Sequence, residues 1–400
     1  MTAGGGEATT AEIAQPPDTV VEKPSITGLE IALKIHSRCN LGCPDCYVYE
    51  GVDQGWRELP RQMSMDILAQ AAGRIGEHAQ QEELDIVSVV LHGGEPLLVG
   101  AGYLRQAAQT LREAVPSKTD LSIGVQTNGI PLSWPGMLET LRDEGIRVGV
   151  SLDGPQATND LYRPHPNGRG SYGEVAANLE RLRDEFPSIY AGILCTVHPG
   201  SDPIETYKTL LSFKPPKVDF LLKYATWDNP PERPTETFYQ DWHTALFDYW
   251  ADLPGEQYTR IRTFESIINL FAGRPSLVEL WGINKAPGVF IQTDGSYEDF
   301  DHLSVTYPGA KATGLHVLHN TIEEFNALPA VRARLAGWTA LSQTCQECPI
   351  VKICGGGRYT DRYRTGSGFC NPSVYCPDLL GIVNHINRRL LTLVNPTDTP

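Results

Sequence analysis

Short apolar runs alternate with amphipathic helical stretches from Leu29 to about Lys223, and this alternation limits the possible folds more than any other feature. The apolar runs are rich in Val, Ile and Leu and do not alternate strictly with polar residues, as expected of parallel strands buried on both faces. Strands and helices in this order form βαβ units with right-handed crossovers. The predicted strands are Ile31–Ile35, Ile86–Leu91, Leu121–Val125, Arg147–Leu152, Gly192–Val197 and Asp219–Leu222, and the predicted helices are Met65–His78, Tyr103–Ala114, Trp134–Asp143, Tyr172–Phe186 and Pro203–Leu211.

Six such units predict an α/β fold, a partial (β/α)6 TIM-type barrel over residues 28–235. In barrels of this type the chemistry collects at the carboxyl ends of the strands. Residues 1–27 are rich in Gly, Ala, Thr and Pro and predict a disordered tail. Residues 236–285 predict a helical linker, with helices at Glu236–Leu253 and Thr263–Phe271.

A second domain is predicted over residues 286–400. It begins with a hairpin, Val289–Gln292 and Ser296–Asp299, around an Asp-Gly turn at Asp294. It contains five of the nine cysteines and closes with a helix over Leu379–Leu393.

The composition excludes several classes of function. The formal net charge of −15 argues against a nucleic-acid partner, which needs a basic surface. No run of eighteen apolar residues exists, so no membrane span is predicted. The N-terminus lacks the pattern of a secretory signal, which predicts a cytoplasmic protein whose cysteines serve metal or catalytic roles rather than disulfides.

Three cysteines, Cys39, Cys43 and Cys46, lie on one loop directly after the first predicted strand. Thiolates at this spacing can hold three corners of an iron–sulfur cube, which normally takes four Cys ligands. One iron would stay open to an external ligand, and an open position at a metal site usually implies chemistry. Structural zinc is the alternative, although zinc sites favour paired C-x2-C units.

The next three strands end in polar, glycine-containing turns, and the four strand ends are predicted to converge on one rim. A single Gly-Gly or Asn-Gly turn would be ordinary loop chemistry, but four together beside a cysteine loop indicate a site. The turns are His92-Gly93-Gly94-Glu95-Pro96, Gln126-Thr127-Asn128-Gly129 and Ser151-Leu152-Asp153-Gly154-Pro155, the last followed by Tyr162-Arg163.

The remaining cysteines fall into two kinds. Cys195 lies mid-strand among apolar residues and is predicted to be a buried core thiol. The others lie near the C-terminus and are numerous enough to complete a metal site, with a zinc knuckle as the alternative for the C-x2-C unit. They are Cys345, Cys348, Cys354, Cys370 and Cys376.

These motifs together resemble those of a radical SAM enzyme with a C-terminal SPASM-type domain, over about residues 29–385. Within that superfamily the chain is similar to the FxsB-like maturases of ribosomally made peptides, which form cyclophane crosslinks. The similarity to these maturases lies in the compact length and in three segments: Gln292–Tyr297, the Cys-Gly-Gly-Gly-Arg-Tyr stretch from Cys354, and Gly368–Cys376.

The resemblance implies specific roles for the rim residues. Cys39, Cys43 and Cys46 would ligate a 4Fe–4S cluster whose open iron binds S-adenosylmethionine (SAM). The remaining contacts to SAM would come from the turns: Gly93, Gly94 and Glu95 at its amine, Ser151, Asp153 and Asn128 near its ribose or carboxylate, Arg163 at its carboxylate unless it forms a surface salt bridge, and Tyr47 beside the adenine.

One departure from the SPASM pattern concerns the auxiliary clusters. Domains with two such clusters carry a cysteine near the Asp-Gly hairpin and another four residues after the third C-terminal one; here residues 289–303 hold none and the second position is Arg358. The resemblance therefore implies one auxiliary 4Fe–4S cluster, which would accept an electron. Its predicted ligands are Cys345, Cys348, Cys354 and Cys376, with Cys370 as the alternative fourth.

The implied activity is carbon–carbon crosslinking, through a 5′-deoxyadenosyl radical, between an aromatic ring and a side-chain Cβ of a precursor peptide. A flavodoxin or ferredoxin would supply electrons. No catalytic base is identified, and Asp294 and Asp299 are candidates by position only. The alternatives are formation of a thioether or a formylglycine and, in another class, a non-catalytic iron–sulfur or zinc protein.

Overall fold

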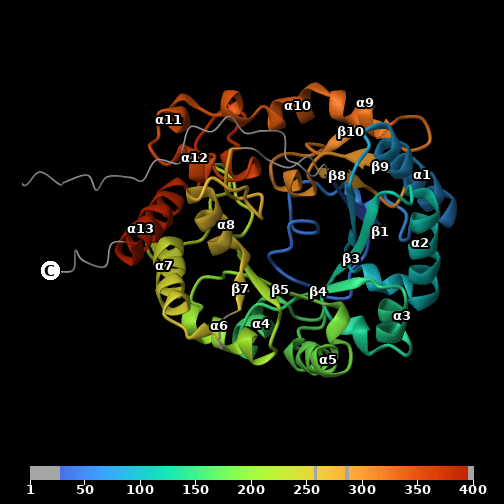
Figure 1. Ribbon diagram of the computed structural model, residues 1–400, viewed down its shortest axis with the longest axis horizontal. Coiled ribbons are helices and arrows are strands. Elements are labelled where there is room, and N and C mark those ends of the chain that lie inside the picture. The colour runs from blue at the N-terminus through green and yellow to red at the C-terminus, as the bar shows by residue number, and fades with distance from the viewer. Residues whose placement is uncertain (1–27, 256–258, 284–287, 395–400) are drawn as a thin grey trace, which may run out of the picture.

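The computed structural model describes residues 28–255, 259–283 and 288–394, so the predicted tail lies outside the described residues. One curved ten-stranded sheet runs through the molecule in the order β10-β9-β8-β1-β2-β3-β4-β5-β6-β7. Helices cover the convex side of this sheet (Figure 1). In the view of Figure 1 the C-terminal helices, orange to red, lie across the gap between the two ends of the curved sheet. No helix in the described ranges has the length and apolarity to cross a membrane.

The six predicted strands all form and pair in parallel, in chain order. This confirms the open α/β barrel. Their outward side chains, such as Val87 and Val89, are fully buried under the helices, which explains their continuous apolar character. The strands are β1 (Gly28–His36), β2 (Ile86–Gly93), β3 (Asp120–Thr127), β4 (Arg147–Ser151), β5 (Tyr190–Thr196) and β6 (Lys217–Leu221).

The helices of the barrel follow from amphipathic periodicity and capping. For α1, the Ser64 side chain accepts a hydrogen bond from Ile67 N, and the buried face carries Leu68, Ala72 and Ile75. The short α4 was not predicted, and α3 starts at Met137 rather than Trp134. The helices are α1 (Met65–Gln81), α2 (Ala101–Ala114), α3 (Met137–Asp143), α4 (Gln156–Tyr162), α5 (Tyr172–Glu185) and α6 (Pro203–Ser212).

The predicted domain boundaries need correction, because segments beyond residue 235 belong to the same sheet. The supposed linker contributes β7 (Arg260–Ile261), parallel to β6, between α7 (Phe238–Ala251) and α8 (Arg262–Phe271). The predicted hairpin, β8 (Gly288–Ile291) and β9 (Ser296–Glu298), pairs β8 in parallel with β1. Its edge continues in β10 (Ala312–His316), antiparallel to β9.

The C-terminal region is mostly short helices, which sequence periodicity cannot reveal. The closing helix α13 (Cys376–Val394) packs along α7. Cys195 on β5 is fully buried, so its prediction as a core thiol is confirmed. The short helices are α9 (Ile322–Ala327), α10 (Pro329–Leu335), α11 (Gln343–Gln346) and α12 (Val351–Cys354).

Candidate active site

The cysteine loop follows β1 and places its three thiols at the carboxyl end of the sheet. The loop is held by its own backbone, with Cys46 N donating to Cys43 O at 3.2 Å and Gly42 N to Pro164 O at 2.8 Å. Cys39, Cys43 and Cys46 are partly exposed and none is in a disulfide. Burial raises the pKa of the Cys39 and Cys43 thiols to about 11.

The Gly93–Gly94 turn lies directly against the start of this loop. Gly94 N donates to His36 O at 2.8 Å, and Glu95 N donates to Arg38 O at 2.9 Å. A Cβ at Gly93 (φ +134°) would meet His36 O at 2.1 Å, and one at Gly94 would meet Arg38 O at 2.5 Å. The glycines are therefore required already by the close approach of two strand ends, in addition to any approach of a ligand.

The Glu95 carboxylate is held by hydrogen bonds within the protein, and its contact with SAM stays a prediction. Glu95 is fully buried, and its carboxylate accepts hydrogen bonds from Asn128 N at 2.7 Å, Thr127 Oγ1 at 2.8 Å and Leu97 N at 3.0 Å. Burial raises the pKa of Glu95 to about 7, against the effect of these donors. Glu95 thus joins the ends of β2 and β3 and positions the turn that carries Asn128.

Asn128 is aimed at the cysteine loop. Its Nδ2 lies 3.6 Å from Cys39 Sγ and donates to Asn40 Oδ1 at 2.7 Å. Ser151, at the end of β4, accepts a hydrogen bond from Gln126 Nε2 at 2.9 Å. Both residues therefore lie at the carboxyl end of the sheet. Asn128 is beside the cysteine loop, and Ser151 is at the end of β4.

Asp153 and Arg163 form an ion pair with each other. Arg163 Nε lies 2.8 Å from Asp153 Oδ2, and the same carboxylate accepts from Thr196 N at 2.9 Å. Burial would raise the pKa of Asp153, but Arg163 and His198 outweigh it and lower the pKa to about 2. The salt bridge that was the alternative for Arg163 is present, although its partner Asp153 is buried rather than on the surface. Contact of either residue with SAM stays a prediction.

A second ion pair anchors the middle of the cysteine loop. The Asp45 carboxylate contacts the Lys223 ammonium and lies 3.6 Å from His198 Nδ1. His198 Nε2 lies 2.9 Å from Asp153, and its ring stacks on Tyr162 at 3.6 Å. The pKa of His198 is raised, since Asp153 and Asp45 outweigh the opposing effect of burial.

The Tyr47 hydroxyl is bound to a buried acid that the sequence reasoning missed. Its hydroxyl donates to Asp301 Oδ2 at 2.9 Å, and Lys34 Nζ and His92 Nδ1 lie 3.5 and 3.9 Å from the same oxygen. Burial would raise the pKa of Asp301, but Lys34 and His92 lower it to about 2. Burial lowers the pKa of His92, whose Nδ1 has no hydrogen-bond partner among the described residues.

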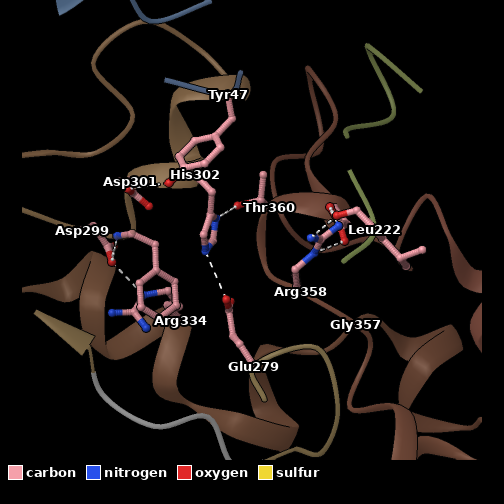
Figure 2. Close-up of polar contacts among 12 residues, drawn as sticks. Tyr47, Leu222, Glu279, Asp299, Asp301, His302, Arg334, Gly357, Arg358 and Thr360 are labelled. Atoms are coloured by element: carbon pink, nitrogen blue, oxygen red, sulfur yellow. Dashed lines mark hydrogen bonds and ion pairs between the residues drawn. The ribbon is translucent and has the colours of Figure 1, made fainter. Parts of the chain in front are cut away.

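Neither of the two acids suggested as a base faces this cluster. Asp294 caps its own turn, accepting from Ser296 N at 2.9 Å. Asp299 pairs with Arg334 Nε at 2.8 Å, on the other side of the segment from Tyr47 (Figure 2). Two residues further on, Asp301 is the acid beside the cysteine loop.

Arg358 stands where a second auxiliary cluster would need a cysteine, and it is fully engaged. Its guanidinium lies 2.7 Å from Asp361, donates to Leu222 O at 2.7 Å and covers the Tyr224 ring at 4.4 Å. Tyr224 also stacks on His302 at 4.7 Å. His302 contacts Thr360 and lies 3.2 Å from Glu279 (Figure 2). Polar and aromatic side chains fill this region.

The C-terminal cysteines gather from three short elements. Cys376 at the start of α13 interacts electrostatically with Cys345 and Cys348, and burial raises its pKa. The Arg362 side chain lies near Cys345 and Cys354 and is held by three glycine carbonyls. Cys370 is exposed. This arrangement favours Cys376 over Cys370 as the fourth ligand.

The donor sets suit clusters better than single ions. Across the described part of the chain, no three His, Cys, Asp or Glu side chains are placed to hold one metal ion. Three thiols on one loop, beside a turn with no room for a Cβ and the amide of Asn128, fit a cube with one open corner.

Comparisons with known proteins agree with this geometry. Residues 33–211 match the family model of the radical SAM superfamily. The cysteine-type anaerobic sulfatase-maturating enzyme of Clostridium novyi (strain NT) is 25% identical over 249 residues, 59% of this chain, and the match spans only 63% of that relative.

Among solved structures, anSMEcpe with bound AdoMet and Cp18Cys peptide superposes with a TM-score of 0.77 at 20% identity, over 92% of this chain and 99% of that one. SuiB of Streptococcus suis bound to precursor peptide SuiA gives a TM-score of 0.58 at 14% identity, over 88% and 76%. At these identities the likeness shows a shared fold. The match to the radical SAM model is confined to residues 33–211, within the partial barrel.

Proposed function

We propose that this protein is a radical SAM maturase that modifies a ribosomally made peptide by forming a carbon–carbon crosslink between an aromatic ring and a side-chain Cβ. The observation that carries the enzymatic part is the three-thiol loop packed against a Cβ-free turn and Asn128. Solved structures of the same fold include complexes with AdoMet and with peptides, which supports a peptide substrate. The crosslink rests on the resemblance of the C-terminal motifs to FxsB-like maturases.

The two groups of cysteines would have different roles, one in binding SAM and the other in electron transfer. Cys39, Cys43 and Cys46 would hold a 4Fe–4S cluster, and the turn at Gly94 and Asn128 would orient SAM on its open iron. When bound, these groups supply a 5′-deoxyadenosyl radical that abstracts hydrogen from the substrate. Cys345, Cys348, Cys354 and Cys376 would hold one auxiliary cluster, which agrees with the absence of a cysteine at Arg358.

His92 is the best-placed acceptor for the proton that the substrate loses. Its Nδ1 has no hydrogen-bond partner among the described residues, and its lowered pKa keeps the ring neutral. Asp301, 3.9 Å away, would stabilise the imidazolium that forms. Because Nδ1 is buried and faces Asp301 while the side chain as a whole is 24% exposed, a substrate beside the Gly93–Gly94 turn would approach the other ring nitrogen, Nε2.

A second candidate reaction is oxidation of a Cys or Ser to formylglycine, favoured by the similarity to an anaerobic sulfatase-maturating enzyme. A thioether is a third possible product. All three need the same radical and a proton acceptor, so the cysteine loop and His92 keep their roles.

Coexpression with the short peptide encoded beside the gene, followed by tandem mass spectrometry, tests the proposal. A crosslink removes two hydrogens and suppresses fragmentation between the joined residues. A formylglycine shows a mass change on a single Cys or Ser and leaves fragmentation intact, and a thioether requires a substrate Cys. An unmodified peptide in the presence of active SAM cleavage would contradict all three.

A further inference from the structure

The lumen of the barrel is open along its depth. Inward positions of β2 to β4 carry small residues, Ser88, Ser122, Gly124 and Gly149, and each remains partly exposed. In a closed (β/α)8 barrel these positions hold layers of bulky side chains. Here they line a cavity of about 230 Å³, bounded by strands β2 to β6.

The amino-terminal end of this cavity is lined by three cations. Arg147 and Lys217 are the first residues of β4 and β6, and Arg262 begins α8. Asp219 is the one carboxylate in the lining, and it already lies 3.7 Å from Arg262 and accepts from Thr263 N at 3.2 Å.

Two of the cations, Arg147 and Lys217, form no direct ion pair within the described part of the chain, although Asp219 acts on Lys217 electrostatically. Arg260 nearby is paired with Glu265. Burial and the positive charges of Arg262 and Arg147 lower the pKa of Lys217. Several cations clustered at one end of a cavity attract an anion.

The other end of the cavity reaches the active-site rim. The cavity lining includes Gln126, whose Nε2 donates to Ser151 Oγ at 2.9 Å. Ser151 ends the strand that begins at Arg147. Four residues of strand cover about 13 Å, a span that an extended peptide bridges with about four residues.

We infer that Arg147, Lys217 and Arg262 form a carboxylate-binding subsite, which holds an acidic group of the peptide substrate about four residues from the residue that reacts at the rim. The acidic group is the C-terminal carboxylate or an Asp or Glu side chain. This inference rests on the proposed peptide maturase function. It adds a specificity rule: substrates carry a carboxylate at a fixed spacing from the modified position.

The test compares two synthetic peptides and an inorganic anion on the full chain with reconstituted clusters and SAM. The peptides are acetyl-Ala-Phe-Ala-Ala-Ala with a free C-terminal carboxylate and the same peptide as its C-terminal amide; the anion is phosphate. The free-carboxylate peptide should bind about tenfold tighter, a factor typical of one good charged contact. In the R147Q/K217Q variant both peptides should bind like the amide.

Arg147→Gln alone provides a second variant with little risk to folding, because Arg147 is exposed. Arg181→Gln, on the outer helix α5, is the matched control and should keep the preference. Equal binding of the two peptides to the wild type, no binding of either at millimolar concentration, or a preference that survives in R147Q/K217Q would overturn the inference.

Binding of phosphate distinguishes a site for free inorganic anions from a site for a peptide carboxylate. Binding of phosphate that R147Q/K217Q abolishes, without discrimination between the peptides, would show a site for free anions and overturn the substrate assignment. SAM cleavage measured in the same samples keeps the two proposals apart. If the wild type cleaves SAM but does not prefer the free-carboxylate peptide, the subsite alone is refuted. If the wild type does not cleave SAM, the radical function is refuted.

Discussion

The two groups of cysteines differ in their origin and surroundings. Cys39, Cys43 and Cys46 come from a single loop at the mouth of the barrel, beside charged pairs such as Asp45–Lys223 and Asp153–Arg163. The C-terminal group is drawn from two short helices, the turn between them and the start of the long helix α13, around an apolar group that includes Leu341 and Val351. Its members are Cys345, Cys348, Cys354 and Cys376.

Under the proposed function, this difference would separate a site that binds a ligand from one that holds a closed cofactor. Three thiols leave one iron of a cube uncoordinated, and the rim supplies polar groups around that position. Four thiols complete the coordination of a cube, and the Arg362 side chain lies near Cys345 and Cys354. The first site is expected to react with SAM and the second to exchange electrons only.

The largest effect is expected from removing the three loop cysteines. Substitution of Cys39, Cys43 and Cys46 by Ala should abolish release of 5′-deoxyadenosine, because no cluster can then bind SAM at the rim. The product is measured by liquid chromatography under anaerobic reduction. Cys370→Ser, an exposed cysteine outside both groups, is the control and should retain full activity; continued cleavage in the triple variant would refute the assignment.

His92→Gln tests whether His92, beside the cysteine loop, accepts the proton that the peptide substrate loses. Loss of a general base typically lowers the rate by about 10²- to 10⁴-fold, so peptide modification should fall by that factor while SAM cleavage continues. Single-turnover assays quantify modified peptide and deoxyadenosine together. His319→Gln, at an exposed histidine, should change neither, and equal losses in both products would contradict the role of His92.

Exchange of single C-terminal cysteines sharpens the account of the second site. Cys376→Ser should remove one of two clusters and therefore about half of the bound iron, because a four-iron cube needs its fourth thiolate. Cys370→Ser should leave the iron content unchanged. Iron and sulfide analysis distinguishes them, and the reverse pattern would assign Cys370 as the ligand.

The smallest effect concerns the charged pairs around the first site. The pKa of Asp153 is lowered to about 2 in the fold, from an ordinary 3.8. Its stabilising contribution is therefore complete above about pH 4 and is lost as the pH falls towards 2. Urea unfolding of the iron-free chain should show the advantage of wild type over Asp153→Asn shrinking by about 1 kcal/mol from pH 6 to pH 3. A constant difference would mean that Asp153 titrates normally.

The regular part of the fold was predictable because burial imposes a pattern on long elements. All six barrel strands appear within two or three residues of their predicted ends. The joining of β8 to β1 was not predictable, since pairing between Val289 and Ile31 is a long-range contact without local signal. The short helices α9 to α12 are stabilised by packing and have too few turns for periodicity to show.

The candidate site divides in the same way. The ligand cysteines and the Gly-Gly turn are local motifs and were predicted from spacing. The internal use of Glu95, Asp153 and Arg163 was missed, because the sequence does not show which polar groups a carboxylate meets after folding. Asp301 and His92 were missed as partners for the same reason, since they come from distant segments that meet at Tyr47.

The most direct test of the difference between the two sites is electron paramagnetic resonance of the reduced clusters with and without SAM. The wild type is compared with the Cys39, Cys43 and Cys46 triple alanine variant, which retains only the C-terminal cluster. The account predicts that SAM changes the wild-type spectrum and leaves that of the variant unchanged. A SAM-dependent change in the variant would show that the open iron belongs to the C-terminal cluster and would contradict the account.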